Sequence, residues 1–421
     1  MNLPIVYINK EDLALFCSYD VPSHKGLSYE WEGEHVVHIR LVPADHSYGK
    51  TDEVLFVRSV NDITDIHKEK YRYIVIVSSD GDSVVYEIDN GELVQRPNEY
   101  IPARIELYSR NKGILEVNIL EGKRVMIVGL GSFGSQIAIE LAKAGVGQFA
   151  LFDFDRVELH NLVRHTSTVN DLGRLKTDVI YDAIKGKNPY AIVDKFPINI
   201  NEDLALLNKE IAKADIVICA TDNNTSRYNI SDALVKQQRI GIFGRAVTRA
   251  EGGDVFRYRP GGPCYCCLIG TGWYDTSAEE ITNLASARRN GQIAAYVSDE
   301  DADVVVQVGL SSDIEPICNL MVKLTLVELS RGMQSGISGL EEELVYDYYM
   351  WANRRERRHA NWAPMPNAGN KPTILRWYGA HIKKVANCPL CSHNIILDEG
   401  EDFEDIVGNN SGLEDIDLSK L

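Results

Sequence analysis

The sequence has no long hydrophobic run. Its longest uncharged stretch, residues 125–139, is shorter than the roughly 20 apolar residues that cross a bilayer, and it contains several glycines and serines. The first residues, MNLPIVYINKED, lack the basic and then apolar pattern of a secretion signal. We therefore expect a protein of the cytoplasm with no membrane segment and no membrane partner.

Basic charge is also scarce. Lys and Arg number 44 against 61 Asp and Glu, which gives a formal net charge of -17. This balance argues against nucleic acid or an anionic membrane as the main partner. The charge is uneven, because residues 398–421 hold nine acidic residues and one lysine, about half of the excess. Their composition predicts an acidic, disordered tail over residues 394–421.

The eight cysteines are clustered and no secretion signal accompanies them, which favours a metal site in a reducing compartment over a disulfide framework. Two C-x2-C pairs stand out, Cys264 with Cys267 and Cys388 with Cys391. Four thiolates from two such pairs suit a closed, structural, tetrahedral zinc site. Such a clip would tie the C-terminal strands to the core. The alternative is four unpaired thiols in a reduced protein.

The chain divides into regions of different pattern. Residues 1–105 are predicted to form a mostly β domain of unknown role, from the short β-branched runs HVVHIRLV, EVLFVRSV, YRYIVIV and SVVYEI. Residues 123–260 instead alternate buried strands with helices of ten to fifteen residues, which predicts βαβ units and a doubly wound parallel sheet. Ligands of such sheets bind at the carboxyl ends of the strands.

A glycine turn follows the first strand of that region. Gly129, Gly131 and Gly134 stand between a strand and a helix, where glycines permit a tight turn and bring phosphate close to backbone amides at a helix N-terminus. Asp153 lies 19 residues after Gly134, the place for an acid that binds a ribose. Asp155, two positions on, could orient neighbouring basic groups; the alternative is a solvated loop acid.

Further charged residues follow this turn at strand or helix ends. Arg164 and Lys176 are cations suited to the charge on a transferring phosphate, and Asp222, after a buried strand, suits magnesium. A hydride-transfer enzyme needs no such set. Together these residues favour phosphoryl chemistry on ATP.

These motifs carry a resemblance. The run VMIVGLGSFGSQIAIELAKAGVGQFALFDFDRVELHNLVRH, followed by GRLKTD, ATDNNTSR, GGPCYCCL and CPLC, resembles the adenylation core of the ubiquitin-activating enzyme superfamily. That superfamily includes the molybdopterin-synthase and thiamine-biosynthesis sulfur-carrier adenylyltransferases. The resemblance covers about residues 105–393. It implies a ThiF-like, Rossmann-type adenylation domain with a zinc clip over residues 106–393.

The resemblance also implies roles for single residues. It gives the phosphates to the glycine turn, the ribose to Asp153 and magnesium to Asp222. Contacts to the triphosphate fall to three residues: Asn161, Arg164 and Lys176. Arg110, in LYSRNKGI, matches an arginine that the family donates across a dimer interface to the partner's ATP. His165 stands where the family usually has a glutamine, which leaves the role of that position open.

By resemblance, the activity is ATP-dependent adenylation of the C-terminal glycine carboxylate of a ubiquitin-like or sulfur-carrier protein by a homodimer. ATP, magnesium and zinc are the expected cofactors, and a conjugating enzyme is a candidate further partner. Two alternatives stay open. One is a nicotinamide-dependent oxidoreductase that uses the same glycine turn, and the other is a catalytically silent scaffold with the adenylation fold.

Relatives that pass their protein to a conjugating enzyme hold it on a thiolate in the segment after the first cysteine pair. Here residues 268–316 contain no cysteine. A thiolate is the nucleophile that such a transfer demands. The sequence thus predicts that the product leaves as the acyl-adenylate, or that Cys266 or Cys318 takes the role of the thiol.

Overall fold

The structure, a computed structural model, describes residues 5–31, 35–41, 50–63, 65–101, 107–247, 250–271, 309–355, 359–361 and 373–392. The chain forms two compact units, Met1–Arg110 and Asn111–Leu421. Over the described ranges, no helix is both long enough and apolar enough to span a bilayer.

The first unit is built on one mixed sheet of eight strands in the order β7-β6-β5-β4-β2-β3-β1-β8. Its strands are β1 (Ile5–Asn9), β2 (Ser23–Trp31), β3 (Val36–Arg40), β4 (Lys50–Val57), β5 (Tyr73–Val77), β6 (Ser83–Asp89), β7 (Glu92–Arg96) and β8 (Asn98–Ile101). Its helices are α1 (Lys10–Ser18) and α2 (Asp65–Lys70).

The four β-branched runs identified in the sequence correspond to β3, β4, β5 and β6. The sequence patterns did not predict α1 or β2. Asn9 caps the N-terminus of α1, and its side chain accepts the backbone N–H of Glu11 at 2.9 Å. Leu13 and Phe16 of α1 belong to the core of this unit. Strand β2, SHKGLSYEW, has few β-branched residues, and its pairing with both β3 and β4 defines it.

The second unit also contains one eight-stranded sheet, in the order β11-β10-β9-β12-β13-β14-β15-β16. Its strands are β9 (Arg124–Val128), β10 (Gln148–Phe152), β11 (Ile192–Phe196), β12 (Ile216–Cys219), β13 (Ile240–Ala246), β14 (Gly252–Tyr258), β15 (Tyr348–Ala352) and β16 (Arg376–Ala380). Its helices are α4 (Val117–Leu120), α5 (Gly134–Ala144), α6 (Lys176–Lys187), α7 (Leu204–Lys213), α8 (Asn224–Gln237), α9 (Tyr265–Ile269), α12 (Ser311–Leu329) and α13 (Leu340–Glu343).

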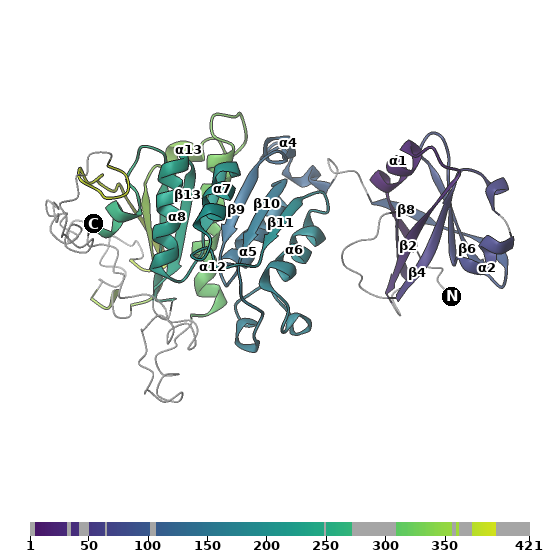
Figure 1. The fold of residues 1–421 in the computed structure, drawn as a ribbon, viewed down its shortest axis with the longest axis horizontal. Coiled ribbons are helices and arrows are strands. Elements are labelled where there is room, and N and C mark those ends of the chain that lie inside the picture. Colours follow the sequence, from purple (N-terminus) through teal and green to yellow (C-terminus); the bar gives the residue numbers. More distant parts are fainter. Residues whose placement is uncertain are drawn as a thin grey trace. The chain divides into compact units, whose positions relative to one another are not determined.

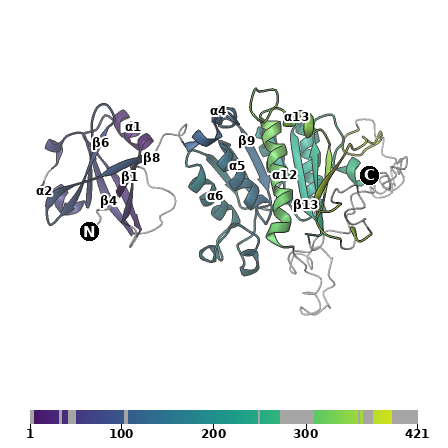
Figure 2. The ribbon, with the colours of Figure 1, turned by 180° about the vertical axis from the view of Figure 1, so that it is seen from behind.

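Helices cover both faces of this sheet (Figures 1 and 2). Val125 and Ile127 of β9 pack in the core that contains residues of α5, α6 and α12, whereas Met126 and Val128 pack in the core with α7 and α8. A strand buried on both faces is apolar at every position, as in VMIV. The five strands from β11 to β13 are parallel, and β14, β15 and β16 continue the sheet antiparallel. The prediction of a doubly wound sheet is confirmed.

The chain reverses its direction of growth across the sheet at β9. Strand β10 pairs with one edge of β9 and β12 with the other, and Val128, Phe152 and Cys219 are paired neighbours at the ends of the three strands. The loops after these strands therefore meet at the switch point, where doubly wound sheets bind ligands. The glycine turn, the Asp153 loop and the Asp222 loop are those three loops.

Candidate functional site

The glycine turn after β9 has two positions that only glycine can occupy. Gly129 has φ of +89°, and a Cβ there would lie 2.6 Å from the Ala220 carbonyl oxygen. A Cβ at Gly134 would lie 1.8 Å from the Gly129 carbonyl oxygen. Gly131 differs, because among the described residues a Cβ there would meet only the His165 ring, at 3.8 Å. The turn thus leaves its middle backbone open to a ligand.

Asp153 connects the end of β10 to this turn. The side chain is 9% exposed, and its two oxygens accept the backbone N–H groups of Leu130 at 2.7 Å and of Asp155 at 2.8 Å. Burial raises the pKa of Asp153, and the nearby Lys176 ammonium acts against that rise. The carboxylate keeps free lone pairs, so it can accept further hydrogen bonds from a ribose.

Lys176, the first residue of α6, lies near three acidic residues of the site. Its Nζ lies 2.9 Å from Asp155 Oδ2, and its side chain is 11% exposed. Burial lowers the pKa of Lys176, but the carboxylates of Asp153, Asp155 and Asp222 outweigh burial, and the pKa is raised. Lys176 therefore stays charged, and the carboxylates of Asp153, Asp155 and Asp222 all lie within electrostatic reach of it.

The loop between β10 and α6 holds Asn161 and Arg164, which are both 5% exposed. Asn161 Oδ1 accepts the Glu158 backbone N–H at 3.0 Å. Arg164 donates from Nη1 to the His160 carbonyl at 3.1 Å, and the Gln136 side chain of α5 donates to the Arg164 carbonyl at 3.4 Å. Hydrogen bonds to the backbone thus fix the loop that carries Asn161 and Arg164, two of the three predicted phosphate contacts.

Asp222 lies in the loop between β12 and α8, and it is exposed. Arg227, 3% exposed, donates to the Thr221 carbonyl at 2.7 Å. The Asn223 side chain caps α8 by accepting the Ser226 N–H at 2.8 Å. These bonds hold the backbone on either side of Asp222, whose carboxylate oxygen is a ligand type that magnesium prefers.

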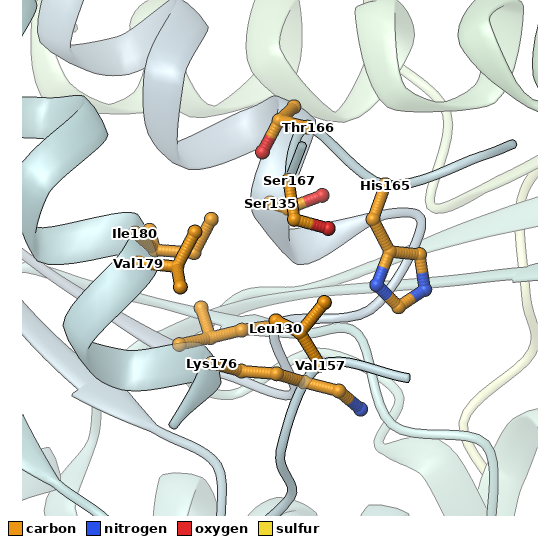
Figure 3. A pocket seen from close by; sticks show the side chains of 9 residues that line it. All are labelled: Leu130, Ser135, Val157, His165, Thr166, Ser167, Lys176, Val179 and Ile180. Carbon is orange, nitrogen blue, oxygen red and sulfur yellow. The ribbon is translucent and has the colours of Figure 1, made fainter. Parts of the chain in front are cut away.

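His165 faces the glycine turn from the loop after β10 (Figure 3). Burial, together with the positive charges of Lys176 and Arg164, lowers the pKa of His165 to about 3. The imidazole is therefore neutral at physiological pH, in a site that already contains two cations.

The four paired cysteines lie together, with their sulfur atoms within 4.8 Å of one another. Cys264 Sγ is 3.9 Å from Cys267 Sγ and 3.3 Å from Cys388 Sγ, and Cys267 Sγ is 3.5 Å from Cys391 Sγ. Zinc–sulfur bonds of about 2.3 Å in a tetrahedron require sulfur–sulfur edges of ~3.8 Å. The observed geometry fits zinc, which would connect α9 to the segment that follows β16.

The other cysteines considered as thiol nucleophiles are buried. Cys266 and Cys318 are each 3% exposed, and burial raises the pKa of the Cys318 thiol. Most of residues 268–316 lie outside the described residues. The departure of the product as an acyl-adenylate stays a prediction, and so does the role of Arg110, which belongs to the first unit.

Sequence reasoning missed the supports of the site. Gln136 and Arg227 position the loops that carry Arg164 and Asp222, yet each has the pattern of an ordinary helical polar residue. Arg227 belongs to the motif ATDNNTSR. Its position four residues after the helix cap Asn223 is the sequence feature that indicates its place in the first turns of α8. No sequence signal pointed to the contact of Gln136 with the loop.

Together, the switch-point position, the glycine turn and the buried lysine near three acids define a doubly wound α/β domain with a candidate ligand site at its switch point. The ThiF family model matches residues 110–341, more than half of the chain, and the protein belongs to the ThiF family.

Similar proteins include the molybdopterin-synthase adenylyltransferase of Escherichia coli, 39% identical over 151 residues, which are 35% of this chain and 59% of that protein. The sulfur carrier protein adenylyltransferase of Thermus thermophilus is 33% identical over 157 residues, 36% of this chain and 56% of that protein. The adenylyltransferase and sulfurtransferase MOCS3 of Anopheles gambiae is 28% identical over 232 residues, 54% of this chain and 49% of that protein. The chain therefore spans about half to three fifths of these relatives' lengths.

Among solved structures, E. coli MccB in complex with MccA-N7isoASN is similar, with a TM-score of 0.48 and 17% identity. The match covers 66% of this chain and 69% of that chain.

The lowered pKa of His165 predicts a pH-dependent loss of stability. Unfolding restores the pKa of His165 to its ordinary value of about 6.5. Below that pH the unfolded chain therefore binds a proton at His165 that the folded chain does not bind. Above that pH the effect vanishes. Between about pH 7.5 and about pH 5, His165→Gln should gain ~2 kcal/mol of unfolding free energy relative to wild type.

Chemical denaturation of both proteins at the two pH values measures this change, and other titrating groups cancel in the comparison. An equal pH dependence of the two proteins would contradict the neutral state of His165.

Proposed function

We propose that this protein uses ATP to adenylate the C-terminal carboxylate of a ubiquitin-like or sulfur-carrier protein. The observation that carries the proposal is the cluster of Lys176 with Asp153, Asp155 and Asp222 at the switch point of a ThiF-family domain. Relatives of this chain are named for adenylation of molybdopterin synthase and of a sulfur carrier protein, which supports the same class of substrate.

In the proposed reaction, a carboxylate oxygen of the carrier protein attacks the α-phosphorus of ATP. The bond from that phosphorus to the bridging oxygen breaks, pyrophosphate leaves with the electron pair, and an acyl-adenylate forms. No general base is needed, because a carboxylate is already ionised at neutral pH. Catalysis then depends on positioning and on electrostatic stabilisation of the phosphate charge.

Each site residue has a proposed part in this reaction. The glycine turn receives the phosphates and Asp153 accepts from the ribose hydroxyls. Asn161, Arg164 and Lys176 contact the phosphate oxygens, and Asp155 holds the Lys176 ammonium in place. Asp222 would hold magnesium, which would neutralise phosphate charge when bound. A C-terminal glycine on the carrier would suit close passage of its tail to the nucleotide.

The two alternative functions predict different results in assays of nucleotide binding and pyrophosphate exchange. An oxidoreductase would bind nicotinamide dinucleotide and show no exchange of pyrophosphate into ATP, and a silent scaffold would bind nucleotide without exchange. The cation Lys176 beside three carboxylates favours phosphoryl chemistry over both, because a hydride-transfer site has no need of it.

We further propose that the active form is a homodimer. Five apolar side chains of the loop between β10 and α6 are exposed by 40–78%: Phe154, Leu159, Val163, Val169 and Leu172. Such a concentration of exposed apolar groups marks an interaction surface. A second copy is the proposed occupant, with Arg110 acting on the partner's ATP.

Asp222→Ala should lower carrier-dependent exchange of pyrophosphate into ATP at least ~100-fold, because the charge on the transferring phosphate loses its metal. The circular dichroism spectrum should not change, because the Asp222 side chain is exposed. Asp232→Ala, which removes a surface pair with Lys236 on α8, is the matched control and should keep wild-type exchange. Exchange within a few-fold of wild type in Asp222→Ala would refute the assignment.

Arg110→Ala and Asp222→Ala should each be inactive alone and should complement each other when mixed. In a mixed dimer one site receives an intact Arg110 and keeps its own Asp222. Random pairing then restores about a quarter of wild-type exchange, because half of the dimers are mixed and each has one intact site. Absence of complementation, after dimer exchange is verified by mass, would place Arg110 in its own chain's site or outside the chemistry.

Zinc should copurify at one equivalent per chain and should leave with a chelator, with a fall in the unfolding temperature of the second unit. Cys391→Ser should lose zinc, because it removes one of four closing ligands. Cys17→Ser, a half-buried cysteine of the first unit, is the control and should keep full zinc content. Retention of zinc in Cys391→Ser, measured by atomic absorption, would exclude this cluster as the site.

A further inference from the structure

A small cavity lies between the glycine turn, α5, α6 and the loop after β10 (Figure 3). Ser135, Thr166 and Ser167 are among its lining residues, but the surface that it exposes is almost wholly apolar. Their hydroxyl oxygens are buried and have no hydrogen-bond partner among the described residues. The cavity therefore offers no site for an anion.

The cavity is also too small for a phosphate group. Its volume is about 10 Å³, whereas a single water already needs roughly 10–15 Å³. A phosphate held by the glycine turn would therefore lie outside this cavity.

The His165 ring stands between this cavity and the glycine turn. Its Nε2 is 3.8 Å from the Cβ position at Gly131, which is the middle of the turn and the one position where the chain itself does not require glycine. In Figure 3 the other ring nitrogen is on the side that faces Ser135 and Ser167. One nitrogen thus faces the middle of the glycine turn, and the other is on the side of the cavity.

A neutral imidazole has one nitrogen that donates and one that accepts. A ring that donates toward the turn carries its proton on Nε2, and Nδ1 is then the acceptor. The ring is kept neutral by burial and by the facing charges of Lys176 on α6 and Arg164 and His160 on its own loop.

We propose that His165 is a nucleotide-contacting residue whose Nε2–H donates to a non-bridging phosphate oxygen at Gly131. The inference rests on the proposed function, since it requires a nucleotide phosphate on the glycine turn. A neutral donor adds a directed hydrogen bond beside two cations without adding a third charge.

Calorimetric titration with magnesium ATP and, separately, with adenosine tests the inference. His165→Leu should weaken magnesium ATP binding ~10-fold or more, the effect of losing a hydrogen bond to a charged group, and should leave adenosine binding unchanged. His165→Gln, which offers an amide N–H at similar reach, should stay within about threefold of wild type. His160→Leu, an exposed histidine of the same loop, is the control.

Three results would overturn the inference. Equal magnesium ATP affinity in wild type and His165→Leu removes the contact, and an equal loss of adenosine and ATP affinity assigns His165 a structural role. Failure of wild type to bind magnesium ATP removes the proposed function itself, which distinguishes the two. If the leucine variant does not fold, the flexible His165→Met gives the same comparison.

Discussion

The ion pair between Lys176 and Asp155 at the carboxyl edge of the sheet is the interaction on which the rest of the site depends. Lys176 opens α6 and Asp155 follows β10, so their contact joins a helix N-terminus to the end of a strand. A buried ammonium is unfavourable unless carboxylates surround it, and Asp153 and Asp222 complete that surrounding. The same charges that make the lysine tolerable therefore fix three loops in one place.

The charge balance of the site explains why a neutral side chain stands beside the cations. Arg164 and Lys176 both act electrostatically on His165, and a third cation there would be repelled by both. His165 satisfies this constraint because its pKa is lowered to about 3. In the proposed site the cations would attract phosphate over a distance, and a neutral donor would give the contact its direction.

The cysteine cluster serves a different need. Strands β15 and β16 form the edge of the sheet opposite to β11. Among the described strands, β16 pairs with β15 alone. A zinc ion between α9 and the segment after β16 would fasten this edge to the helices of the sheet's second face, because Cys264 and Cys388 both belong to that face's core. Because cysteine sulfur atoms would fill all four positions around the metal, such a zinc ion would contribute to folding stability and not to catalysis.

The sequence by itself determined the parallel sheet, the glycine turn and the residue types around it, because apolar runs such as VMIV and glycine spacing are local patterns. It also determined the two cysteine pairs. Only the tertiary structure decided that Lys176, Asp153 and Asp222 form one cluster, since their contacts cross the switch point between strands distant in the chain. It likewise decided that His165 is neutral and that the hydroxyls of Ser135 and Ser167 find no partner within the described ranges, because burial and hydrogen bonding at these positions come from elements that no local pattern connects.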